Sequence, residues 1–115
     1  MNEKQFAIYM NSMCFDIGLM GKEIKGYKFE YESFDGTVYF YKDGEEVIYY
    51  CTPSYCMCYR EYQENNNKIR INFQKDDGDY LDENKSTESY MPLTFDLETD
   101  VEVYYSKVEE YIDTL

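Results

Sequence analysis

Apolar side chains near the N-terminus recur with the period of an α-helix. Four of them stand at i, i+4, i+7 and i+11: Phe6, Met10, Met13 and Ile17. This spacing places side chains on one face of a helix. Asn2 can cap the helix, because its side-chain oxygen can accept a backbone N–H of the first turn. The pattern predicts a helix over about residues 3–20.

From Lys25 onward the apolar period changes to two. Tyr27, Phe29 and Tyr31 alternate with charged residues, which is typical of a half-buried strand. Asp43-Gly44 is a hairpin signal, since both residues tolerate the positive φ of a type I′ turn. The alternation and the turn residues predict five strands, at residues 27–32, 37–42, 46–51, 55–63 and 69–73.

The last third of the chain combines a polar segment with a second helical stripe. Residues 75–90 are rich in Asp and Glu and predict a loop. Leu97, Val101, Tyr104 and Val108 then follow the helical spacing, and Thr99 to Glu102 fits a capping box at the helix start. The fold expected is a single α+β domain over residues 1–115, with an N-terminal helix, an antiparallel meander and a C-terminal helix, both helices lying on one sheet face.

Charge is concentrated in the same third of the chain. Residues 1–75 hold 11 acids and 9 bases, whereas residues 76–115 hold 13 acids and only Lys85 and Lys107 as bases. An acidic region of this kind repels nucleic acid and anionic membranes and attracts basic protein surfaces over a long range. We therefore expect the partner to be a basic protein, with no direct binding to nucleic acid or membrane.

The candidate partner-binding residues fall into two groups. One group belongs to the acidic loop: Asp76, Asp77, Asp79, Asp82 and Glu83. The other is a row expected on the outward side of the second helix: Glu98, Glu102, Tyr105, Glu109 and Asp113. An acidic row can also be an ordinary solvated helix face. However, such faces usually mix both signs, because like charges four residues apart destabilise a helix by a few tenths of a kcal/mol.

The residue types and their spacing do not indicate a catalytic or metal-binding site. The chain has no His, and the acidic loop lacks the Gly at the sixth position that an EF-hand requires. Cys51, Cys56 and Cys58 do not have zinc-site spacing, and with Cys14 we expect all four to be reduced and metal-free. The sequence predicts no catalytic residue, no metal and no cofactor.

The tyrosines offer a second surface. The chain has 15 Tyr, many of them on the predicted strands, including Tyr39, Tyr41 and Tyr50. Cross-strand tyrosine pairs on a half-wet sheet face explain this pattern without any partner. The alternative is a tyrosine-rich binding face, since Tyr is enriched at interface hot spots.

The chain is small and strongly acidic, has a short helix-and-sheet core, and is rich in residues with AT-rich codons. In these features it resembles the small phage-encoded anti-defence proteins, including anti-CRISPR proteins and other DNA mimics. The resemblance is one of general character over the whole chain. It implies an inhibitor that occupies the nucleic-acid-binding cleft of a nuclease or defence effector through the acids named above. The apolar runs near the N-terminus, such as Phe6 to Met10, are too short for a secretory signal or a membrane span, so we expect a cytoplasmic protein, in the cytoplasm of the host cell if it is phage-encoded.

Two other interpretations stay open. A bacterial immunity protein that neutralises a basic toxin would use the same electrostatic attraction. A regulatory interaction module could carry the acidity for solubility alone.

Overall fold

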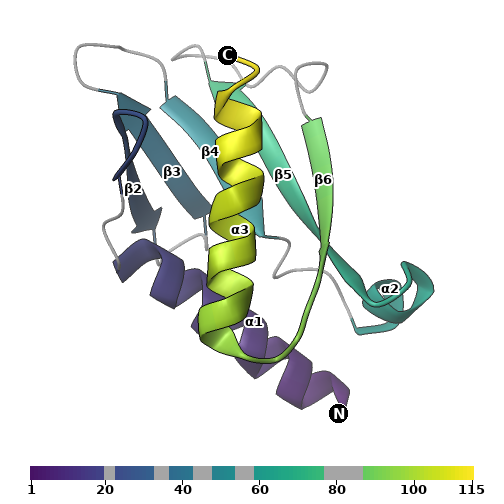
Figure 1. Ribbon diagram of the computed structural model, residues 1–115. Coiled ribbons are helices and arrows are strands. Elements are labelled where there is room, and N and C mark those ends of the chain that lie inside the picture. The colour runs from purple at the N-terminus through teal and green to yellow at the C-terminus, as the bar shows by residue number, and fades with distance from the viewer. Residues whose placement is uncertain (20–22, 33–36, 43–47, 54–58, 77–86) are drawn as a thin grey trace.

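α1 (Glu3–Leu19) is followed by an antiparallel meander and a C-terminal helix (Figure 1). The computed structural model describes residues 1–19, 23–32, 37–42, 48–53, 59–76 and 87–115. The remaining elements, in chain order, are β1 (Glu23–Ile24), β2 (Tyr27–Glu32), β3 (Thr37–Lys42), β4 (Ile48–Pro53), α2 (Tyr59–Glu64), β5 (Lys68–Asp76), β6 (Thr87–Pro92) and α3 (Leu97–Ile112). Within the described ranges, six strands form one sheet in the order β1-β2-β3-β4-β5-β6. The predicted α+β class is confirmed.

α1 begins with the cap that the sequence predicts. The N–H of Gln5 donates to Asn2 Oδ1 and the N–H of Asn2 donates to Gln5 Oε1, each at 2.9 Å. This reciprocal arrangement satisfies two backbone donors at once. The predicted stripe is buried along the helix: Phe6, Met10, Met13 and Ile17.

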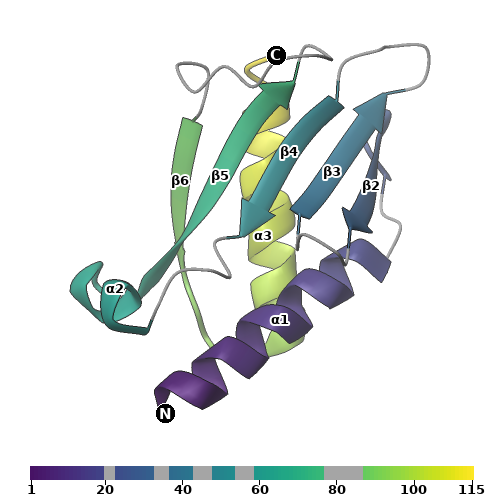
Figure 2. The same cartoon turned by 180° about the vertical axis from the view of Figure 1, so that it is seen from behind.

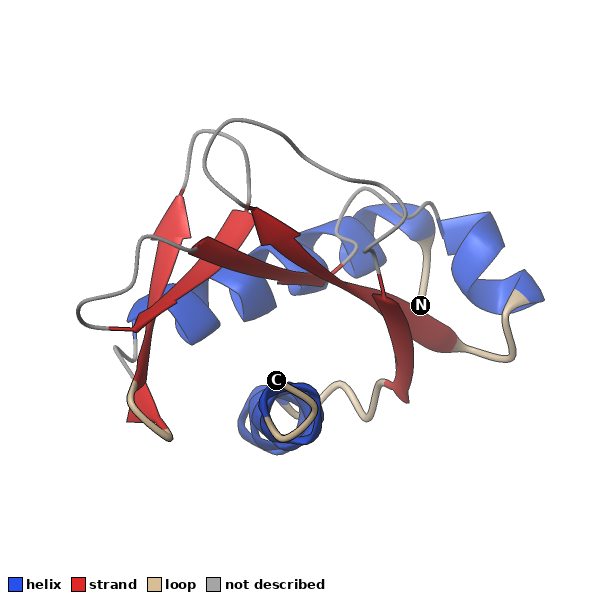
Figure 3. Cartoon of the chain, turned by 90° about the horizontal axis from the view of Figure 1, so that it is seen from above, coloured by secondary structure: helices blue, strands red, loops and turns tan. Residues whose placement is uncertain are grey.

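The sheet buries one face, and no helix of the described residues covers the other. The buried side chains of β2, β3, β5 and β6 alternate along their strands: Tyr27, Phe29, Val38, Phe40, Ile69, Ile71, Phe73 and Met91. α3 lies in the concavity of the curved sheet (Figure 3). α1 crosses the end of the sheet where β2 ends and β3 begins (Figures 1 and 2), and it contacts α3 as well as β2. The two helices and this sheet face therefore share one core.

The strand predicted for residues 55–63 is wrong from residue 59 onward; residues 55–58 lie outside the described part of the chain. Tyr59 to Glu64 form α2, in which Arg60 Nε lies 3.0 Å from Glu64 Oε1. Tyr62 anchors this helix, with its ring 4.8 Å from that of Phe6. Asn67 ends the helix, since its N–H donates to the Tyr62 carbonyl and its φ is positive.

The loop predicted for residues 75–90 is also wrong at both ends. β5 extends to Asp76, and β6 begins at Thr87 and pairs with β5 from Phe73↔Thr87 to Lys68↔Pro92. Met91 is the one buried side chain of β6. This strand is held by backbone pairing to β5 more than by an apolar alternation, so the period-two signal is weak.

Candidate protein-binding surface

α3 begins three residues earlier than the predicted capping box. The N-cap is Asp96, not Thr99. Thr99 already lies in the first turn, where its Oγ1 donates to Asp96 Oδ2 at 2.7 Å. The Asp96 side chain therefore accepts a hydrogen bond from a hydroxyl and not from a backbone N–H of the helix. The backbone N–H of Asp96 donates to Thr94 Oγ1 at 3.2 Å.

A buried carboxylate fixes this end of α3 to the rest of the fold. Asp100 is 0% exposed and is the one buried charged residue in the described part of the chain. It accepts hydrogen bonds from Thr94 Oγ1 at 2.8 Å, from the N–H of Thr94 at 2.9 Å and from the N–H of Phe95 at 3.1 Å. The hydroxyl of Tyr9 on α1 donates to the same carboxylate. Asp100 therefore joins α1, the turn before α3 and α3 itself.

This contact changes the acidity of the tyrosine. Burial of the ring, followed by the hydrogen bond to the Asp100 carboxylate and the negative charges of Asp100 and Asp96, raises the pKa of Tyr9 well above its usual value. Loss of the phenolic proton would place a second negative charge beside a buried carboxylate. Tyr9 is thus a structural donor and remains protonated at neutral pH.

The outward side of α3 carries the acids that the sequence singled out. Glu98, Glu102, Glu109 and Asp113 are all exposed. At 3.6 residues per turn they fall within an arc of about 60° and extend over roughly 22 Å of helix. Glu110, which the sequence prediction omitted, is exposed beside them. Of the five acids within α3, Asp100 alone is buried.

Tyr105 does not belong to this surface, so its assignment to the outward row is wrong. Its side chain is 3% exposed. The hydroxyl donates to the Ile17 carbonyl at 3.0 Å, and the ring packs edge-on against Phe29 at 5.7 Å. α3 is contacted by the sheet beneath it and by α1 at its side, so its buried arc is wider than a single apolar stripe indicates.

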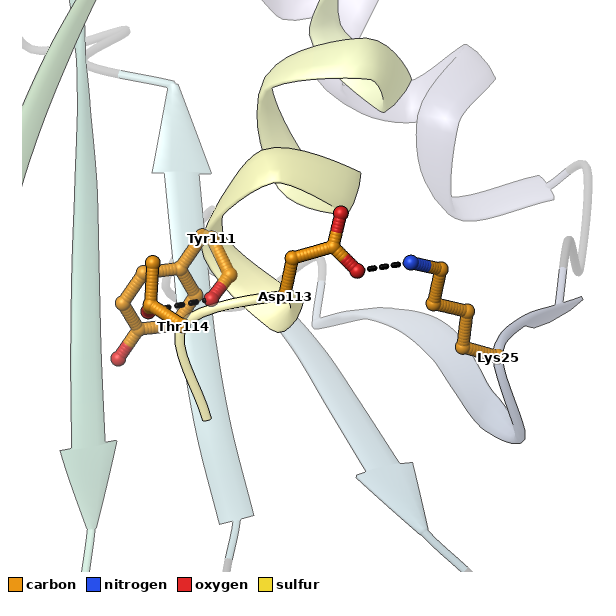
Figure 4. A network of polar contacts seen from close by, with 4 residues as sticks. All are labelled: Lys25, Tyr111, Asp113 and Thr114. Atoms are coloured by element: carbon orange, nitrogen blue, oxygen red, sulfur yellow. Dashed lines mark hydrogen bonds and ion pairs between the residues drawn. The ribbon is translucent and has the colours of Figure 1, made fainter.

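Asp113 at the end of α3 has a structural contact as well as exposure. Figure 4 shows its carboxylate beside the ammonium group of Lys25, in the turn between β1 and β2. Nearby, Thr114 Oγ1 donates to the Tyr111 carbonyl at 2.6 Å and stabilises the last turn. An exposed pair of this type contributes about 0–1 kcal/mol. Asp113 thus also helps to hold the C-terminal end of α3 to the sheet.

Most of the acidic loop lies outside the described part of the chain. Asp76 is the last residue of β5, where its backbone pairs with Ile48. The other four loop acids lie outside the described residues: Asp77, Asp79, Asp82 and Glu83. The assignment of these five to the partner surface stays a prediction.

Two of the predicted tyrosines whose side chains are described, Tyr39 and Tyr41, lie on the sheet face opposite the core. The rings of Tyr39 and Tyr41 stack at 6.4 Å with an interplanar angle of 17°, and Tyr39 pairs with Tyr50 in register. Further along the sheet, the Tyr90 hydroxyl donates to Glu88 at 3.0 Å, which raises the pKa of Tyr90. Both tyrosines of the stacked pair are half-buried, which agrees with cross-strand packing.

Other chemistry is limited within the described residues. They contain no group of three or more His, Cys, Asp or Glu side chains that could hold a metal ion. Cys14 is buried in α1, and the side chains of the other three cysteines fall outside the description. No described helix is long and apolar enough to cross a membrane.

Comparisons of the chain with protein-family models, with curated proteins and with solved structures give no match. The function is therefore inferred from the residues and contacts of this chain alone.

Proposed function

We propose that the protein is a non-catalytic acidic inhibitor that binds the basic nucleic-acid-binding cleft of a nuclease or defence effector. The outward row on α3, namely Glu98, Glu102 and Glu109 with Asp113 at its end, stands in for a phosphate backbone in that cleft. The inhibitor acts in the cytoplasm, where such effectors meet nucleic acid.

The observation that carries the proposal is the placement of acids against the preferences of the helix. Glu109, Glu110 and Asp113 lie at the C-terminal end of α3, which has no basic residue in its last turn. Helix C-termini carry partial negative charge, so acids there cost roughly 0.3–1 kcal/mol each. Glu98 lies in the first turn, where the helix dipole favours an acid, so the unfavourable placement is that of the three C-terminal acids, of which Glu109 and Asp113 also repel each other at i, i+4. An arrangement that weakens the helix is explained by selection for binding a cationic surface.

The ion pairs of the molecule leave part of this row available. Lys107 lies 3.8 Å from Glu110, and Lys25 pairs with Asp113. Glu98 and Glu109 make no ion pair with any cation of the described chain. Their negative potential extends into solvent over about a Debye length, which is roughly 8 Å at physiological salt. Such a field accelerates encounter with a basic cleft.

The test compares two variants with the same change of charge. The α3 variant combines Glu98→Gln, Glu102→Gln and Glu109→Gln. The control combines Glu3→Gln, Glu61→Gln and Glu64→Gln, whose parent side chains are exposed on α1 and α2. Immobilised parent protein captures the partner from the native host at low salt, and the purified partner is then titrated with each variant.

We expect the α3 variant to lose roughly tenfold or more in association rate at low salt, since steering of this kind changes on-rates by about 10–1,000-fold. The control variant should stay within about twofold of the parent. Equal behaviour of the two variants would mean that net charge, and not the α3 row, governs association.

A further inference from the structure

A hollow opens between β6 and the C-terminal half of α3. Its volume is about 380 Å³, and the described residues that line it include Phe73 on β5, Glu88 on β6, and Lys107, Glu110 and Tyr111 on α3. The segments that line it, the start of β6 and the C-terminal half of α3, lie at the opposite end of the sheet from α1 (Figure 1).

The floor of the hollow is aromatic. Phe73 and Tyr111 stack with ring centroids 4.5 Å apart and an interplanar angle of 19°. Phe40 meets Tyr111 edge-on at 6.3 Å, so the Tyr111 ring is held in a fixed orientation. Phe73 is 2% exposed, whereas Tyr111 is half-buried. The partly exposed ring of Tyr111 can therefore offer a π-surface to a ligand cation.

The charges around this floor favour a cation. Two carboxylates, Glu88 and Glu110, line the hollow against one ammonium group, that of Lys107. Lys107 and Glu110 are 3.8 Å apart, and the Glu110 side chain is 72% exposed, so this pair is loose and solvated. The last turn of α3 also directs its partial negative charge toward this end of the helix. Glu88 also lies 3.9 Å from Arg70, which is outside the lining, so Glu110 and the C-terminal end of α3 are the groups that favour a cation here.

We propose that this hollow receives an arginine side chain from the basic partner. This rests on the proposed function, since it names a group of the same partner. A guanidinium is planar, stacks on aromatic rings and can bind a carboxylate through two N–H groups, whereas an ammonium group does neither as well. Proteins that bind nucleic acid present arginines toward phosphates, and Glu110 offers such an arginine a carboxylate beside the Tyr111 ring. Lys107 is the internal competitor that the arginine displaces.

The experiment titrates the ¹⁵N-labelled full chain with a capped Gly-Arg-Gly peptide and follows backbone amide shifts by NMR. Matched peptides carry lysine or citrulline, the neutral isostere of arginine, at the central position. The arginine peptide should shift amides of residues 107–114 and 87–89. The lysine peptide should bind more weakly, and the citrulline peptide should give no saturable shift there.

Three variants sharpen the result. Glu110→Gln, an exposed change that spares the fold, should weaken arginine-peptide binding by roughly two- to fivefold. Tyr111→Leu should weaken it by roughly two- to fivefold through loss of the cation–π contact. Lys107→Gln should strengthen it by about twofold, because the competing ammonium is gone.

Several outcomes would overturn the arginine assignment. They are equal binding of the lysine and arginine peptides, no effect of Glu110→Gln, or weaker binding by Lys107→Gln. The two proposals fail separately. The α3 variant leaves the hollow unchanged, so loss of peptide selectivity refutes the arginine site only, and an unaffected association rate of the α3 variant refutes the phosphate-mimic row only.

Discussion

Replacement of Tyr9 by Phe removes one atom from the contact that joins α1 to α3. The phenolic oxygen donates to Asp100, whose carboxylate is 0% exposed. Thr94 and Phe95 remain as donors to that carboxylate. A hydrogen bond to a charged buried group contributes about 1.5–3 kcal/mol, so Tyr9→Phe should lower the free energy of unfolding by about 2 kcal/mol at pH 7.

The same substitution should change the response to alkaline pH. A tyrosine in the unfolded chain loses its proton near pH 10, while in the folded protein the pKa of Tyr9 is raised. Between these two values the unfolded state binds fewer protons than the folded state, so stability falls as pH rises. The upper bound is about 1.4 kcal/mol per pH unit. Because a tyrosine of the unfolded chain is only half deprotonated at pH 10, the change between pH 10 and 11 is about 1 kcal/mol.

Tyr9→Phe has no such proton to lose. The stability difference between parent and variant should therefore be full below pH 9 and should shrink by about 1 kcal/mol between pH 10 and 11. Urea unfolding followed by far-UV circular dichroism measures both quantities. Tyr59→Phe is the matched control, because that hydroxyl makes only an exposed hydrogen bond to the Met1 carbonyl at 3.2 Å. A variant as stable as the parent at pH 7, or a difference that does not shrink above pH 10, would contradict this role of the Tyr9 hydroxyl.

Three further outcomes are expected. Tyr105→Phe removes the hydroxyl that donates to the Ile17 carbonyl at 3.0 Å. It should lower the free energy of unfolding, measured in urea, by about 1–3 kcal/mol, whereas the same substitution of a tyrosine pointing into solvent would leave it unchanged. Glu98→Gln with Glu102→Gln should change the free energy of unfolding by less than about 1 kcal/mol, because the favourable interaction of Glu98 with the first turn of α3 is lost while a repulsion of a few tenths of a kcal/mol is removed. A larger loss of stability would show that these acids support the fold through other contacts. The parent protein should bind neither DNA nor RNA at physiological salt in a fluorescence-anisotropy titration, and sub-micromolar binding would end the mimic interpretation.

The elements with one buried face and one solvent-exposed face could be predicted from the sequence. The stripe of α1, the hairpin of β2 and β3 and the apolar side of α3 follow from burial on one face, which imprints a period of 3.6 or 2 on the residues. α2 was missed because it is short: Tyr59 and Tyr62 have the helical spacing i, i+3, but they follow a run rich in Tyr and Cys that favours a strand. β6 was missed because its pairing with β5 uses backbone groups, which leave little trace in residue type.

The candidate surface could be predicted only in part. The exposed acids of α3 follow from their position opposite the apolar stripe. Tyr105 was misplaced because α1 covers a flank of α3 that no local period reveals. Asp100 had one available signal, since it stands four residues before Tyr104 on the buried side. A carboxylate there requires donors, and those come from Thr94 and from Tyr9, which is 91 residues away in sequence.

Competition with nucleic acid at the partner's cleft tests the central claim most directly. The captured partner is loaded with a fluorescent oligonucleotide, and the inhibitor is titrated in at several oligonucleotide concentrations. Phosphate mimicry requires that the oligonucleotide be released completely and that the midpoint rise in proportion to the oligonucleotide concentration. The α3 variant should require a higher concentration than the Glu3, Glu61 and Glu64 control. A ternary complex of partner, oligonucleotide and inhibitor would contradict the proposed function.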